Sequence, residues 1–225
     1  MSSVVALPDG AGALEPKARL EGAEIKGLSV RSLTREGLNL GKVTLRLPKS
    51  TPPGTYAGSL ELGGRRMPLA VEVEARPKIE ASPSRLSLEV EPGAEVTTDV
   101  TLHNVGNVPF QVPAASTFCV FDGRGVDHAF WVAFVTEPPD MKERIDLLLD
   151  DLADSHGGLV EVRARATERT IAPGDSRDVQ VTLRFSDRIR AGRRYAGSWG
   201  TDGLHLRVRV RVPARNGKQR AAEAA

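Results

Sequence analysis

The chain has 225 residues, enough for one large β domain or two small ones, each with a buried core. Hydrophobic residues make up 40% of it and charged residues 27%, a balance typical of globular rather than disordered chains. The 31 Lys and Arg residues nearly balance 29 Asp and Glu, which argues against a surface built as a whole for nucleic acid. The single cysteine excludes an internal disulfide framework.

Membrane and targeting signals are not recognisable in the sequence. No apolar run approaches the roughly 20 residues that span a bilayer, so we expect no membrane insertion. The first ten residues carry neither a basic region nor a long apolar stretch of the kind a signal peptide needs. These features favour a cytoplasmic location, or the cell envelope if an upstream leader has been lost.

Alternation of apolar and polar residues is the dominant pattern along the chain. It puts one face of a strand on a core and the other in water, which is typical of antiparallel sheets. Gly and Pro turn signals separate the alternating runs, as β-sandwiches require. In chain order, weak strand candidates at 17–20 and 25–33 precede firmer ones at 43–47, 69–74, 86–90, 179–183 and 204–212.

An internal repeat links the two ends of the chain. Residues 43–46 recur as 181–184 at an offset of 138, and residues 56–59 recur as 195–198 at an offset of 139. The second offset persists along the final strand, where Leu69, Val71 and Val73 match Val208, Val210 and Val212. Two copies of one three-strand ending predict two domains of the same fold, with a boundary at 75–78.

One segment, 140–155, breaks the strand pattern. Prolines precede it and Gly157-Gly158 follows it, so we expect a helix of about four turns inserted in the second domain. One interpretation, which we favour, buries its apolar stripe against its own β-sandwich; the other makes the helix a docking surface for a partner. The stripe consists of Met141, Ile145, Leu148, Leu149 and Leu152.

The segment 82–112 carries a pattern of turn residues between alternating runs: Pro83, Gly93, Asn104, Gly106 and Pro109. On these residues it resembles the opening half of Hydin-type and major-sperm-protein-like immunoglobulin (Ig) domains, a class that includes PapD-like folds. The segment from Pro53 to Tyr56 is similar to the tyrosine corner of bacterial Ig-like β-sandwiches, where a hydroxyl ties a crossover to the backbone. The resemblance implies a fold and leaves the function open, because this class hosts adhesion, scaffolding, chaperone and enzyme-accessory roles.

We therefore predict an all-β protein of two tandem Ig-like antiparallel β-sandwiches, 1–77 and 78–214, with a helical insertion near 140–155 and a disordered tail at 215–225. Tyr56 and Tyr195 are predicted to be structural tyrosines at equivalent positions, each with its hydroxyl near backbone.

The first domain is short, with five or six strand candidates where about seven are needed. We expect its own segment Ser3–Leu7 to supply a strand, because a tethered strand has the higher effective concentration. A strand donated by a partner is the alternative.

Few side chains are spaced for chemistry. Asp122, Asp127 and His128 crowd one segment and offer ligands for a metal or groups for acid–base catalysis. Their spacing fits no metal-binding motif, and a turn rich in Asp and Gly accounts for them. Cys119, in an alternating strand, is predicted to be a buried structural thiol rather than a nucleophile paired with His128 or His156. We expect no enzyme activity, metal or cofactor.

Two charged ladders face outward from the matching final strands of the two domains. Glu72 and Glu74 lie on the first, and Arg207, Arg209 and Arg211 on the second. One interpretation is that these charges keep sheet faces soluble. The other is an interaction surface, in which the basic face of one molecule meets the acidic face of another.

The sequence thus favours a non-catalytic structural or protein-interaction module. We expect a protein partner or self-association, and no nucleic acid, membrane insertion or small-molecule ligand. The alternative is an assembly chaperone or subunit that uses strand complementation. A metal-dependent enzyme centred on Asp122, Asp127 and His128 is the third hypothesis.

Overall fold

The computed structural model describes residues 2–6, 16–35, 38–135 and 140–214. The tail at 215–225, predicted to be disordered, lies outside the described residues. The chain divides into two compact units: unit 1 comprises residues 1–77 and 105–108, and unit 2 comprises residues 78–104 and 109–225. Each unit is described by itself.

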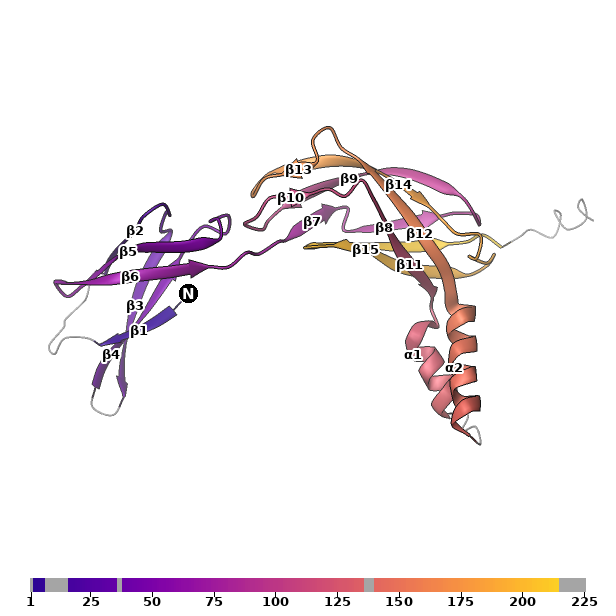
Figure 1. The fold of residues 1–225 in the computed structure, drawn as a ribbon, viewed down its shortest axis with the longest axis horizontal. Helices are drawn as coiled ribbons and strands as arrows, with labels where there is room; N and C mark the ends of the chain where they lie inside the picture. The colour runs from indigo at the N-terminus through magenta and orange to yellow at the C-terminus, as the bar shows by residue number, and fades with distance from the viewer. Residues whose placement is uncertain (1, 7–15, 36–37, 136–139, 215–225) are drawn as a thin grey trace, which may run out of the picture. The chain divides into compact units, whose positions relative to one another are not determined.

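Unit 1 contains two three-stranded antiparallel sheets (Figure 1). The first has the order β1-β4-β3 and the second the order β2-β5-β6. Their small core includes the buried Leu20, Leu45 and Val71, which come from both sheets. The strands are β1 (Ser2–Ala6), β2 (Lys17–Leu20), β3 (Gly27–Arg35), β4 (Leu38–Arg46), β5 (Gly54–Leu62) and β6 (Arg65–Val73).

The N-terminal segment supplies a strand to its own unit. β1 pairs antiparallel with β4, from Ser2 opposite Thr44 to Ala6 opposite Leu40. This pairing confirms the prediction for the segment Ser3–Leu7, of which Leu7 lies outside the described residues. The strands expected at 17–20 and 25–33 are also present, as β2 and β3.

Unit 2 is built on a closed barrel of seven strands. Hydrogen-bonded neighbours follow the order β15-β11-β12-β14-β9-β7-β16, and β16 pairs back to β15. β8 extends along β16, and β10 pairs with β13 in a separate sheet. Its elements are β7 (Ile79–Ser82), β8 (Arg85–Glu89), β9 (Glu95–Asn104), β10 (Phe110–Gln111), β11 (Ala115–Asp122), α1 (Gly125–Val135), α2 (Met141–Ser155), β12 (His156–Arg165), β13 (Thr170–Ile171), β14 (Ser176–Arg184), β15 (Arg194–Thr201) and β16 (Leu204–Arg211).

The prediction of two tandem Ig-like antiparallel β-sandwiches is therefore wrong. Alternation along a strand tells which residues face a core, but not which strand pairs with the next. In unit 2, β7 joins β9 to β16 and β11 joins β12 to β15, so the strands close into one ring. These long-range pairings have no signal in the local pattern.

The barrel interior follows from the alternation predicted for the last strand. Leu204, Leu206, Val208 and Val210 are buried along β16, and the residues between them are exposed. Trp199 of β15 is also buried, and its indole nitrogen donates a hydrogen bond to Ser116 Oγ at 2.8 Å. A buried Trp needs such an acceptor, because an unpaired indole N–H is costly in an apolar core.

The repeat appears in the structure as a repeated strand register. Tyr56 lies opposite Val71 in the β5–β6 hairpin, and Tyr195 lies opposite Val210 in the β15–β16 hairpin. Both hydroxyls bond to nearby backbone, as predicted: Tyr56 Oη donates to the Pro52 carbonyl at 2.7 Å, and Tyr195 Oη accepts from the Arg190 N–H at 3.0 Å.

A glycine two residues after each tyrosine lets the neighbouring strand come close. Gly58 lies opposite Leu20 of β2, and Gly197 lies opposite Val120 of β11. A Cβ at either position would collide with a backbone carbonyl of that strand, Arg19 O in unit 1 and Cys119 O in unit 2. The Tyr-Ala-Gly-Ser repeat thus encodes one packing arrangement twice.

We predict that Gly197→Ala destabilises the protein by about 1–3 kcal/mol, the usual cost of forcing extra atoms into a packed site. Gly200→Ala, in the same strand, is the control, because the nearest heavy atom to its Cβ would be Leu204 O at an ordinary 3.4 Å. Urea unfolding measures both. Equal unfolding free energies for the two variants would contradict the close approach.

Candidate functional site

A helical hairpin connects β11 to β12. In Figure 1, α1 and α2 lie side by side and project from the end of the barrel where β11 ends and β12 begins. The α2 helix matches the predicted helix at 140–155, and Asp140 caps it by accepting a hydrogen bond from the Glu143 N–H at 2.7 Å. The sequence pattern did not predict α1.

The α1 helix is apolar on almost every side. Its fully buried Ala129 and Ala133, one turn apart, let α1 pack closely on α2. The signal for this helix was a dense apolar run after Gly125, but a run without helical periodicity does not distinguish a helix from a strand. Both helices belong to unit 2.

Large hydrophobic side chains are exposed almost only on this hairpin. Of the nine that the described residues leave exposed, eight lie on α1 and α2, and the ninth is Leu159 of β12. Trp131 is the most exposed on α1, at 59%, and Phe130 stacks on Phe134 with ring centroids 6.1 Å apart. The eight are Val126, Phe130, Trp131, Phe134, Val135, Met141, Ile145 and Leu149.

The expectation that the α2 stripe is buried against its own β-sandwich is therefore wrong. Met141, Ile145 and Leu149 are exposed, and Leu148 and Leu152 are only half-buried. The physical reason is that α2 packs against α1, which was not predicted, and does so through the side of α2 opposite the exposed residues. His128 of α1 shares a hydrogen bond with Asp151 of α2, Nδ1 to Oδ2 at 2.9 Å, which holds that side inward.

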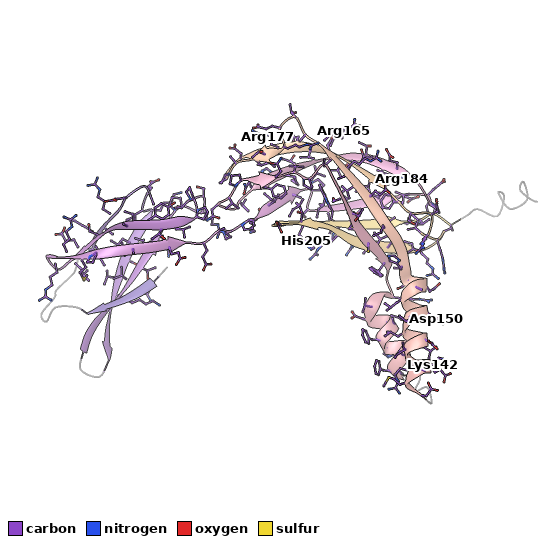
Figure 2. All side chains as sticks on the ribbon, in the orientation of Figure 1. Lys142, Asp150, Arg165, Arg177, Arg184 and His205 are labelled. Carbon is purple, nitrogen blue, oxygen red and sulfur yellow. The ribbon has the colours of Figure 1, made fainter. Side chains whose placement is uncertain are left out.

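Acidic side chains border the exposed apolar residues. Asp127 on α1 and Glu143, Asp146 and Asp150 on α2 are exposed, while Lys142 is the one exposed cation among the described residues of the two helices. Lys142 and Asp150 are labelled on α2 in Figure 2. The hairpin therefore presents apolar groups with a mostly acidic border.

An ionic network fixes the base of the hairpin to the barrel. The Arg193 guanidinium lies 2.9 Å from Asp122 Oδ2 at the end of β11 and 3.1 Å from Asp154 Oδ2 in the last turn of α2. Arg190 also bonds to Asp154, and the Arg124 guanidinium lies 3.6 Å from it. Since Arg193 holds both chain segments of the base, it restricts the direction in which the hairpin points.

The same contacts shift two ionisation equilibria. Hydrogen bonds from Arg193 and Arg190 lower the pKa of the Asp154 carboxyl. The hydrogen bond to Asp154 in turn raises the pKa of Arg193.

The residues predicted as a metal or acid–base cluster have other partners. Asp122 binds Arg193 with its side chain only 6% exposed, His128 binds Asp151, and Asp127 is exposed on α1. Within the described part of the chain, no group of three or more His, Cys, Asp or Glu side chains is placed to hold a metal ion.

Cys119 is exposed, so the prediction of a buried thiol is wrong. It lies on β11, where the neighbouring Phe118 and Val120 are the buried residues. In an alternating strand the residue between two inward-facing ones points outward, and the apolar character of Cys119 concealed this register.

The charged ladders lie on separate units. Arg207, Arg209 and Arg211 are exposed on β16 of unit 2, and Arg211 lies 3.9 Å from Glu89 of β8. Glu72 and Glu74 are exposed in unit 1, the first on β6 and the second just after it. An interaction surface formed by these ladders stays a prediction.

Comparisons with known proteins show a remote likeness in structure alone. No family model matches the sequence, and no curated protein matches it. A protein of unknown function from Porphyromonas gingivalis W83 aligns over 94% of this chain and 91% of its own, with 11% identity and a TM-score of 0.29.

The endo-fucoidan hydrolase MfFcnA4 from glycoside hydrolase family 107 aligns over 96% of this chain, with 6% identity and a TM-score of 0.25. This chain covers 26% of that enzyme. Neither similarity bears on the resemblance of residues 82–112 to Hydin-type and major-sperm-protein-like domains. No helix among the described residues is long and apolar enough to cross a membrane.

We predict that Arg193→Gln raises the pKa of Asp154 toward its ordinary value of 3.8. In the native protein, Asp154 contributes stability above its unfolded pKa, and this contribution is lost as the pH falls through the lowered native pKa. A carboxyl-carbon NMR titration measures the shift. Arg194→Gln is the control, because it removes a positive charge at the neighbouring position in the sequence. An unchanged pKa of Asp154 in Arg193→Gln would contradict the ionic network.

Proposed function

We propose that this chain is a non-catalytic protein-interaction module that binds a partner protein through the α1–α2 hairpin. The observation that carries the proposal is the concentration of eight exposed large hydrophobic side chains on two adjacent helices. Large apolar side chains exposed together on neighbouring helices are costly in water, and apolar patches of this kind mark interaction sites. Trp and Phe are also well suited to anchor an interface, because each buries a large area with few rotatable bonds.

The charges around the apolar residues select the kind of partner. Asp127, Glu143, Asp146 and Asp150 border them, so the matching surface is apolar with a rim of Lys and Arg. A second copy of the chain would bring two acidic borders together. An anionic lipid surface would repel them.

The anchored base supports a docking role as well. Arg193 joins Asp122 and Asp154, so the hairpin is held in one orientation before a partner arrives. Binding by a preorganised element loses less conformational entropy. The non-catalytic part of the proposal is supported by the pairing of Asp122 with Arg193 and of His128 with Asp151, since both groups are already engaged.

The test uses the full chain as bait in an extract of the native cells. The double variant Trp131→Ser/Phe134→Ser removes two anchors of the hairpin, and Leu159→Ser is the matched control because Leu159 is exposed on β12 instead. We expect a protein that the native chain and Leu159→Ser retain, that the double variant loses, and that added salt releases.

The retained protein is then purified and titrated by calorimetry against the native chain and each variant, and the fluorescence of Trp131 in the native chain reports whether the hairpin becomes buried. We expect a blue shift of the native chain's fluorescence and, by calorimetry, at least about tenfold weaker binding by the double variant. Equal retention by all baits would overturn the proposal. Selective binding of the native chain to phosphatidylserine vesicles would overturn it too. So would a dimer formed by the native chain and by Leu159→Ser but not by the double variant.

A further inference from the structure

Six strands of unit 1 repeat four of the pairings among six strands of unit 2; a fifth, β11 with β12, has no counterpart in the described part of unit 1. The sheet β1-β4-β3 corresponds to β9-β14-β12, and β2-β5-β6 corresponds to β11-β15-β16. The registers agree: Val43 of β4 lies opposite Val30 and Ser3, and its repeat Val181 lies opposite Ala164 and Thr98. Unit 1 is thus comparable with unit 2 strand by strand.

Unit 2 also has the segment β7–β8, which has no counterpart among the six matched strands. β7 joins β9 to β16, and β8 continues along the same edge of β16 in parallel, with Arg85–Glu89 opposite Arg207–Arg211. In the described part of unit 1, no strand takes this place beside β6, which ends its sheet. The outer edge of β6 is unpaired in these residues.

The inward-facing side chains of β6 are less buried than their counterparts on β16. On β16, Leu206 and Val208 are 0% and 1% exposed, and Leu86 of β8 belongs to the same buried cluster. Their counterparts on β6, Met67 and Leu69, are only half-buried. The core of unit 1 therefore lacks the cover that β8 gives to unit 2.

We propose that the outer edge of β6 is a strand-acceptor site. An extended segment of a partner protein adds to it in parallel, in the register that β8 takes on β16. This site is in unit 1, and it is independent of the function proposed for the hairpin.

The backbone groups that would bind the added strand follow from the repeat. The Arg207 N–H donates to the Ser84 carbonyl, and the Arg211 carbonyl accepts from the Val90 N–H, so alternate residues of β16 face β8. The equivalent residues of β6 are Pro68, Ala70 and Glu72. Pro68 has no N–H to donate, which leaves Ala70 and Glu72 as the donors and limits pairing to the second half of β6.

The side chains specify the donor. β8 places Leu86 and Leu88 beside Val208 and Val210, so the donor needs apolar residues beside Leu69 and Val71. β8 places Glu89 against Arg211, at 3.9 Å. Since β6 has Glu72 at the equivalent position, the donor needs a Lys or Arg there.

The probe is a fluorescent peptide of residues 84–90 that carries Glu89→Lys, titrated against the full chain. Lysine suits Glu72 of β6 and is repelled by Arg211, so the peptide does not suit the β8 position of unit 2. We expect saturable binding, and weaker binding of the unchanged 84–90 peptide.

The Ala70→Pro variant removes one edge donor at an exposed position, where an edge strand tolerates proline. We expect it to bind the peptide about tenfold more weakly, with an unchanged thermal midpoint. Ala70→Val keeps the N–H and is expected to bind like the native chain. The hairpin variant Trp131→Ser/Phe134→Ser is expected to bind the peptide normally, which separates this site from the function proposed above.

A second variant keeps the proposal testable if Ala70→Pro fails to fold. Glu72→Lys reverses the charge of the site, so it is expected to prefer the unchanged peptide over the Glu89→Lys peptide. Equal binding of both peptides to the native chain and to Glu72→Lys would overturn the proposal. If the native chain forms a dimer and the Ala70→Pro variant does not, the edge of β6 binds a second copy of the chain, and this outcome would also overturn the proposal.

Discussion

The backbone N–H and C=O groups at a sheet edge need partners, and in unit 2 the segment β7–β8 supplies them. β7 closes the ring between β9 and β16, and the residues of β16 that face inward are then buried. The closed ring also gives the hairpin its support. α1 and α2 leave from β11 and β12, and Arg193 ties Asp154 of the hairpin to the end of β11.

Unit 1 satisfies the same requirement only in part. Its six strands repeat the registers of unit 2, and β1 pairs with β4 as β9 pairs with β14. The edge of β6 has no described partner, and its inward-facing Leu69 remains half-buried. The chain thus offers two features suited to polypeptides, an apolar helical hairpin with acidic borders and a strand edge with a defined register. Both features support the interaction module proposed above.

The sequence pattern predicted what depends on local alternation and on repetition. Alternation located β16, helical spacing located α2, and the repeat placed Tyr56 and Tyr195 in equivalent registers. It did not predict what depends on distant partners. Ring closure rests on pairings between remote strands, and the exposed stripe of α2 rests on α1, whose mostly apolar sequence has no clear helical period. For the candidate site, the apolar residues of α2 were identified correctly, but they were wrongly predicted to be buried.

Amide hydrogen exchange distinguishes the open edge of β6 from the edge of β16 that β8 covers. We expect fast exchange at Ala70 and Glu72 and strong protection at Arg209 and Arg211. Val71 serves as an internal control, because its amide faces β5 and is expected to be protected. Protection of Ala70 and Glu72 equal to that of Arg209 and Arg211 would show that the outer edge of β6 is paired and would rule out a strand-acceptor site there.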